Sequence, residues 1–269
     1  MRLRLFLLFL PAGIFFAAFF LLPLAQLFII GAGGERGFAA YAAIVTDRNY
    51  RASLVSTFLL SAGVTLVTLA ISGIAGVFLT RNRFPLRRAL VAMLTFPLAF
   101  PGVVIGFMVI MLAGRQGLIG DVTQWLTGEK LVFAYSMAGL FLGYVYFSIP
   151  RTILTVMAAA EKLDPKLEEA ARSLGASPLR VVKDVIVPGL KPAFIAAGAI
   201  CFATAMGAFG TAFTLATRIN VLPMVIYTEF TLAANIAMAA ALSFILGAVT
   251  WLALALARNA AGSSVAAAG

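Results

Sequence analysis

The 269-residue sequence has no histidine, one cysteine (Cys201) and few charged residues, which make up only 11% of the chain. Without histidine, a His-based metal site and a His-dependent catalytic triad are impossible, and one cysteine cannot form an internal disulfide. Ordinary soluble domains carry about 25% charged residues. The low charge, a hydrophobic fraction of 62% and a mean hydropathy of +1.05 therefore exclude a water-soluble globule and a disordered chain. The net charge of +10 is too sparse for a nucleic-acid groove, so we expect a lipid bilayer as the partner and no nucleic acid.

Long apolar runs make up most of the sequence. A helix that crosses the hydrocarbon core needs about 20 consecutive, mostly apolar residues, because lipid offers no partner for free backbone groups. A transmembrane barrel would instead show segments of about ten residues that alternate between apolar and polar. The runs that satisfy the helical condition are Leu5–Ile30, Leu54–Thr80, Ala89–Leu112, Leu131–Pro150, Phe194–Thr217 and Asn235–Leu256. The sequence predicts an all-α polytopic membrane protein with six transmembrane helices within residues 1–257 and a disordered tail at 258–269.

Basic residues are distributed unevenly between the two sides of this predicted topology. The run from Leu5 is longer than the roughly 7–15 apolar residues of a secretory signal, so we expect it to be a retained anchor. With a cytoplasmic N-terminus, fourteen of the twenty Lys and Arg residues fall on the cytoplasmic side. Because cytoplasmic loops are enriched in these residues, the asymmetry favours both termini in the cytoplasm, most clearly through the loop from Arg81 to Arg88.

The longest predicted cytoplasmic segment, residues 151–192, carries the capping signals of two short helices. Asp164-Pro165 is typical of an N-cap followed by proline in the first turn, and Ser177-Pro178 repeats the pattern. Gly175 is placed to end the first helix in a left-handed conformation, and we expect Pro188-Gly189 to stop the second. The pattern fits either an amphipathic connector on the membrane surface or a rigid element that docks into a groove on a soluble partner.

A long motif in the same segment resembles the signature of permease subunits in binding-protein-dependent ABC importers. That signature reads Glu-Ala-Ala, three residues, Gly, nine residues, Ile, one residue, Leu-Pro. The residues that match at the required spacing are Glu169, Ala170, Ala171, Gly175 and Pro188. Val185 and Val187 replace the Ile and the Leu, and both departures keep an aliphatic side chain. The resemblance is specific over about Leu163–Pro192 and covers most of the chain as topology.

The resemblance implies a type I ABC importer permease fold in a bacterial inner membrane. The segment 161–188 between the fourth and fifth spans would contain a coupling helix that docks on a separate cytoplasmic ATPase. The implied docking residues are Glu168, Glu169, Ala170, Ala171, Arg172, Leu174, Gly175, Ala176, Ser177 and Pro188. The implied partners are two ABC ATPase subunits, a second homologous or identical permease and an extracytoplasmic solute-binding protein.

Chemistry on this chain itself is not expected. The sequence contains no glycine-rich P-loop motif, so ATP and Mg would be bound by the partner ATPase. We expect no cofactor, no metal site and no catalytic residue here. The chain would be the non-catalytic subunit of an ATP-driven transporter.

Candidate solute-pathway residues come from polar and aromatic positions in the apolar runs. We expect Tyr144, Thr204 and Phe209 to line the pathway, although aromatic residues at such positions usually serve helix packing. Arg151, at the inner end of the fourth run, is expected to be an interfacial anchor. The chain most resembles the spermidine/putrescine permease group, with 2-aminoethylphosphonate, sulfate or molybdate, and iron permeases as related groups. Sulfate and iron importers often carry Gly-Glu-Phe-Gly where this chain has Ala208 in place of the acid.

Two other classes of protein are alternatives. A self-powered secondary transporter usually keeps ionisable groups at mid-membrane, and the six apolar runs contain no Lys, Arg, Asp or Glu. An integral membrane enzyme would need a cluster of nucleophiles, acids or metal ligands, whereas Asp121 and Glu129 are isolated in a predicted outer loop. Both alternatives are therefore less favoured than a permease subunit.

Overall fold

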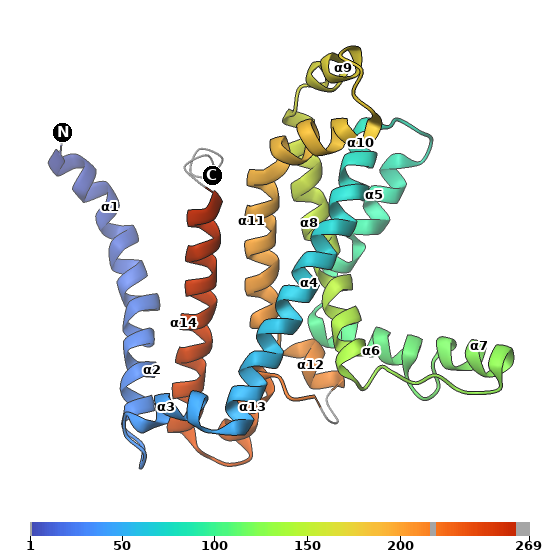
Figure 1. Ribbon diagram of the computed structural model, residues 1–269. Helices are drawn as coiled ribbons and strands as arrows, with labels where there is room; N and C mark the ends of the chain where they lie inside the picture. Colours follow the sequence, from blue (N-terminus) through green and yellow to red (C-terminus); the bar gives the residue numbers. More distant parts are fainter. Residues whose placement is uncertain (1, 216–218, 262–269) are drawn as a thin grey trace. The chain divides into compact units, whose positions relative to one another are not determined.

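Helix is the regular secondary structure in residues 2–215 and 219–261, which the computed structural model describes (Figure 1). Two elements are π-helical turns (η1, η3) and one is a 3-10 turn (η2). The elements are α1 (Arg2–Phe16), η1 (Ala17–Leu21), α2 (Leu22–Ala32), α3 (Ala39–Thr46), α4 (Arg48–Arg81), α5 (Arg87–Thr95), η2 (Phe96–Ala99), α6 (Gly102–Ala113), α7 (Leu118–Thr127), α8 (Met137–Lys162), α9 (Pro165–Ser173), α10 (Pro178–Val181), η3 (Val182–Ile186), α11 (Val187–Met206), α12 (Gly210–Leu215), α13 (Leu222–Thr231) and α14 (Ile236–Ala261). The predicted all-α fold class is confirmed.

Six helical stretches of the described chain are long and apolar enough to cross a membrane, as the sequence predicts. They are Phe9–Ala32, Arg48–Arg81, Gly102–Thr127, Met137–Lys162, Pro178–Met206 and Ile236–Asn259. The first, second and sixth lie within about two helical turns of the predicted bounds. The third, fourth and fifth differ more, and each difference has a local cause.

The fourth crossing begins and ends later than predicted. The hydroxyl of Ser136 accepts a hydrogen bond from the backbone nitrogen of Gly139 at 3.4 Å, which caps α8 at its first turn. The helix then passes through Pro150 and ends at Lys162. The prediction that Arg151 lies at the end of this span is therefore wrong, because the residue lies in the interior of α8.

A wider turn precedes Pro188, which was expected to end a helix, and a second one precedes Pro23. The π-turn η3 ends two residues before Pro188, just as η1 ends two residues before Pro23. Proline lacks the N–H of a regular α-turn and its ring collides with the carbonyl four residues back, and a wider turn relieves both problems. The prediction that Pro188-Gly189 stops a helix is wrong: α10, η3 and α11 form one continuous helical stretch that includes the fifth crossing.

Helix breaks divide the third and fifth predicted runs, and the observed crossings begin or end at these breaks. Phe100 and Pro101 separate η2 from α6, so the predicted run Ala89–Leu112 is divided. Residues 207–209 separate α11 from α12, within the run that was predicted to continue to Thr217. Residues 216 and 217 of that run lie outside the described residues.

The chain forms two compact units, of which the first comprises residues 1–57 and 220–249. Its buried core joins α3, α13 and α14 through Ala40, Ala43, Ile44, Leu222, Met238, Ala241 and Leu242. Two polar contacts fix its connecting segments. The backbone nitrogen of Leu222 donates to the Thr57 hydroxyl at 2.8 Å, and the Tyr50 hydroxyl donates to Glu229 at 2.8 Å.

The second unit comprises residues 58–219 and 250–269 and contains both candidate sites. Within it, α6 and α12 pack closely on each other: the Thr211 hydroxyl donates to the Gly102 carbonyl at 2.9 Å. A Cβ atom at Gly102 would lie 3.0 Å from that hydroxyl oxygen, so the close approach depends on glycine. Figure 1 shows α9 and α10 at one end of α8 and α7 at the other.

The last helix reaches further than the predicted transmembrane domain. α14 ends at Ala261, so residues 258–261 are helical although the sequence analysis placed them in a disordered tail. Alanine is the strongest helix former, and this end of the chain is rich in it. The rest of the predicted tail, residues 262–269, lies outside the described residues.

Candidate functional sites

The first candidate site is the docking segment, residues 161–188, in which α9 is capped at both ends. The Asp164 carboxylate accepts a hydrogen bond from the backbone nitrogen of Lys166 at 3.0 Å, as expected of an N-cap. At the other end, the nitrogen of Ala176 donates to the carbonyl of Ala171 at 3.0 Å, the long-range bond of a Schellman motif. Gly175 has a φ of +83°, a left-handed conformation that strains any residue with a Cβ. The predicted capping of α9 is confirmed.

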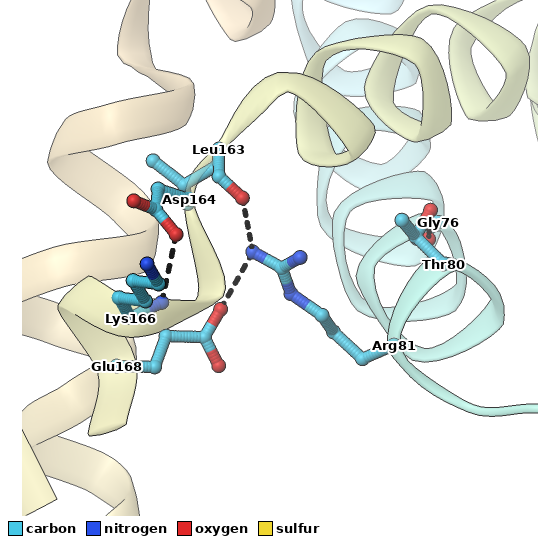
Figure 2. Close-up of polar contacts among 7 residues, drawn as sticks. All are labelled: Gly76, Thr80, Arg81, Leu163, Asp164, Lys166 and Glu168. Atoms are coloured by element: carbon cyan, nitrogen blue, oxygen red, sulfur yellow. Dashed lines mark hydrogen bonds and ion pairs between the residues drawn. The ribbon is translucent and has the colours of Figure 1, made fainter.

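A largely buried ion pair ties α9 to the end of α4 (Figure 2). Nη2 of Arg81 lies 2.7 Å from Oε1 of Glu168 and donates to the Leu163 carbonyl at 3.0 Å. The side chains retain exposures of only 21% for Arg81 and 10% for Glu168. The guanidinium of Arg81 therefore contacts both the turn before α9 and α9 itself, and fixes both to the end of α4.

Apolar packing fixes the underside of the docking segment. Its core consists of buried residues from α8, α10, η3 and α11, with side chains of α4 and α9 packed against them. The buried members are Val156, Ala160, Val181, Ile186 and Leu190. Ala171 and Ala176 of the motif pack against this core. The docking segment is consequently attached to the ends of three membrane-crossing helices.

The opposite side of the docking segment exposes apolar side chains. Leu174 is 89% exposed and Leu179 is 80% exposed, beside a half-exposed Leu167. A shallow depression lies next to them, lined by Ala171, Leu174, Ala176, Arg180, Lys183 and Asp184. Exposed leucines on a segment that packs against a buried core are a surface typical of a protein contact.

The structure thus divides the ten predicted docking residues into two groups. Three face inward or are partly covered: Glu168, Ala171 and Ala176. Seven are exposed: Glu169, Ala170, Arg172, Leu174, Gly175, Ser177 and Pro188. The hydroxyl of Ser177 also caps α10 by accepting from the nitrogen of Arg180 at 3.4 Å. Some residues of the motif therefore attach the segment to the rest of the chain, and the others form an exposed surface.

The second candidate site is a cavity of about 250 Å³ beside the break between α11 and α12. Its lining residues are Gly102, Tyr144, Phe147, Ser148, Thr204, Ala205, Gly207, Ala208, Gly210 and Thr211. Two of the three predicted pathway residues, Tyr144 and Thr204, lie here. The Tyr144 hydroxyl donates to the Ala208 carbonyl, which occupies a backbone acceptor at the helix break. Phe209, the third, packs its ring on Phe213 with centroids 5.2 Å apart.

Arg151 lies beside this cavity. Its Nη1 donates to the hydroxyl of Thr204 at 3.2 Å, and its guanidinium carbon lies 5.3 Å from the centroid of the Phe147 ring. It also borders a smaller neighbouring recess with Ser148 and Cys201. The sequence analysis missed this position because it ended the fourth span at Pro150. A basic residue immediately after a proline, with apolar sequence continuing on both sides, is the signal that could have found it.

Comparison with solved structures shows which fold this chain shares. Over 97% of this chain and 95% of the other, the fold matches a crystal structure of a bacterial alginate ABC transporter in complex with alginate pentasaccharide-bound periplasmic protein, with a TM-score of 0.79 and 15% identity. The fold is therefore that of an ABC importer permease.

Sequence comparison then identifies the family. Residues 69–261 match the family described as binding-protein-dependent transport system inner membrane component. The molybdenum transport system permease protein ModB of Escherichia coli (strain K12) is 33% identical over 69% of this chain and 81% of the relative. The sulfate transport system permease protein CysT of Salmonella typhimurium (strain LT2) is 32% identical over 77% of this chain and 73% of the relative. The chain belongs to this family and is an inner-membrane permease subunit of an ABC importer.

Proposed function

We propose that this chain forms part of the solute pathway and is driven by a separate ABC ATPase that docks on residues 161–188. The observation that carries the proposal is the two-sided docking segment. Its inner side is fixed by the Arg81–Glu168 ion pair and an apolar core, and its outer side exposes Leu174 and Leu179. A rigid helix with an exposed apolar side suits insertion into a groove on a partner.

The attachments of α9 suggest how force would pass from the ATPase to the membrane. A displacement of α9 would pull on α4 through Arg81 and on α8 through the chain itself. It would also press on α11 through the buried contacts around Leu190. Rigid elements with two alternative packings can transmit such movements over long distances. The helix ends would then move together when the ATPase pair closes on nucleotide.

The complete transporter would contain further subunits. We expect two ATPase subunits, a second homologous or identical permease, and an extracytoplasmic solute-binding protein, with both termini of this chain in the cytoplasm. The family description names binding-protein dependence, and the matching alginate transporter was solved with a periplasmic protein. ATP and Mg would be bound by the ATPase subunits, not by this chain.

The solute belongs to the small solutes carried by related permeases. The sequence resemblance suggested a polyamine-type solute, with 2-aminoethylphosphonate, sulfate or molybdate, and iron as related cargoes. The relatives ModB and CysT are named for molybdenum and sulfate transport. Their similarity supports the oxyanion group more than the polyamine group.

Uptake into vesicles tests the energy source. With the assembled transporter, we expect uptake to stop when the ATPase subunit or ATP is omitted and to continue when ionophores dissipate the ion gradients. A secondary transporter would give the reverse result, which would overturn the proposal.

A further inference from the structure

We propose that Arg151 is an anion-recognition residue of the solute pathway and that the transported solute is an oxyanion. The inference rests on the proposed function, because it assumes that the cavity beside α11 belongs to the pathway. It names the residue that would contact the solute and the sign of the solute's charge. Neither follows from the fold or from the docking segment.

The depth of Arg151 in the membrane is the first argument. It lies fourteen residues after Met137, the first residue of α8, or about 21 Å along the helix at 1.5 Å per residue. Its hydrogen-bond partner Thr204 lies on α11, which belongs to the fifth crossing. The whole of α8 has 26 residues, or about 39 Å, so Arg151 lies near the middle of this membrane-crossing helix. Charged groups at that depth are rare and mark ion or substrate pathways.

The second argument is that no carboxylate neutralises this charge. The sequence has no Asp or Glu from residue 130 to 160 or from residue 185 to 228, which include the interiors of α8 and α11. In the described residues, the contacts of Arg151 are a hydroxyl and an aromatic ring. These contacts orient the guanidinium and leave its remaining donors for another acceptor.

The third argument is the chemistry of the adjoining cavity. Its volume of about 250 Å³ is below the roughly 300–1,000 Å³ of pockets for drug-sized ligands, which suits a small solute. The hydroxyl of Ser148 and the exposed glycine at 207 offer polar atoms along its wall, while the Thr204 hydroxyl donates to the Ile200 carbonyl at 2.7 Å and serves to position Arg151. A guanidinium matches the oxygens of phosphate-like anions in a forked geometry. The same charge would repel a polyamine, so the polyamine group suits this site poorly.

Thiol reactivity tests this inference without knowledge of the solute. A cysteine at residue 204, made as Thr204→Cys in a Cys201→Ala background, is treated in the assembled transporter with an anionic and a cationic methanethiosulfonate reagent. Field focusing by the Arg151 charge should make the anionic-to-cationic rate ratio about tenfold higher with Arg151 than with Arg151→Gln. Gln124→Cys on exposed α7 serves as the control, and its ratio should not depend on residue 151.

Two outcomes of that experiment would overturn the inference. An unchanged ratio would show that Arg151 does not concentrate anions, and a thiol at 204 that reacts with neither reagent would show that water does not reach the site. Failure of the proposed function would give a different result: uptake would proceed without ATP, while the anionic-to-cationic rate ratio at residue 204 would still depend on Arg151. Where the wild type accumulates sulfate, molybdate or 2-aminoethylphosphonate, Arg151→Gln should lower that uptake at least tenfold, and Arg151→Lys should retain more of it. Accumulation of spermidine in place of all three anions would also contradict the inference.

Discussion

Two arginines of this protein lie in contrasting surroundings. Arg81, at the end of α4, is mostly covered and meets a carboxylate of Glu168 and a backbone carbonyl. Arg151, in the interior of α8, is exposed in the chain and meets a hydroxyl and an aromatic ring. A buried charge with a carboxylate partner fixes structure, whereas a mid-membrane charge without one remains available to a solute. The identity of a charged residue therefore says less about its role than the partners around it.

Removing the carboxylate beside Arg81 should have the largest effect. Glu168→Ala leaves a mostly buried guanidinium unpaired, which costs about 3 kcal/mol. Hydrogen exchange of the α9 backbone should accelerate about 100-fold as a result. Asp121→Ala is the matched control, because its ion pair with Lys130 spans 2.7 Å but the carboxylate is 60% exposed. An equal effect of the two substitutions would remove the structural role assigned to Arg81.

The exposed side of the docking segment should matter for association and not for stability. Leu174→Asp adds a charge to a side chain that is 89% exposed, so the isolated chain should be unaffected. If Leu174 is an anchor in the ATPase groove, its loss should weaken association about 30-fold, or about 2 kcal/mol. Titration of the purified ATPase onto the detergent-solubilised chain measures this. Leu232→Asp, on a residue 76% exposed at the end of α13 and outside the six crossings, should leave association unchanged.

A carboxylate beside Arg151 should make its surroundings resemble those of Arg81 and should remove its ability to bind an anion. Thr204→Asp places a carboxylate where a hydroxyl now lies 3.2 Å from Nη1. The new ion pair should neutralise the site and lower oxyanion uptake about tenfold, because opposite charges at such distances suppress further anion binding. Thr204→Asn keeps a similar size without the charge and should lower uptake less. Equal uptake by both variants would show that charge at this position is unimportant.

The turn after α9 should give the smallest effect. Gly175 has a φ of +83° and open space around its Cα, so a side chain there is limited by backbone strain and not by neighbours in the chain. Gly175→Ala should therefore destabilise the turn by about 1 kcal/mol, while Gly175→Asn, which tolerates this conformation, should cost less. Limited proteolysis at the docking segment compares them. If Gly175→Asn still weakens ATPase association, the partner must approach Gly175 closely. If Gly175→Asn associates as the wild type does, the glycine is needed only for the backbone conformation of the turn.

Features that depend on local sequence could be predicted, and those that join distant segments could not. The caps at Asp164 and Gly175 are local, so their spacing predicted α9 correctly. The Arg81–Glu168 contact joins two helices far apart in the chain, and nothing in either segment names its partner. Two predictions that a helix ends at a proline were wrong. A π-turn precedes Pro188 and the helix continues through it, and α8 continues through Pro150. Because the fourth run was predicted to end at Pro150, Arg151 was placed at the end of a span and not in the interior of α8.

Cysteine crosslinking can show whether the ATPase binds at the docking segment. In a Cys201→Ala background, Ser173→Cys presents a thiol on the exposed side of α9, and Gln124→Cys presents one on α7. With a short bifunctional thiol reagent, we expect the thiol at 173 to capture the ATPase subunit in the assembled transporter, and nucleotide to change the crosslinking yield. Capture of the ATPase from residue 124, with none from residue 173, would contradict it.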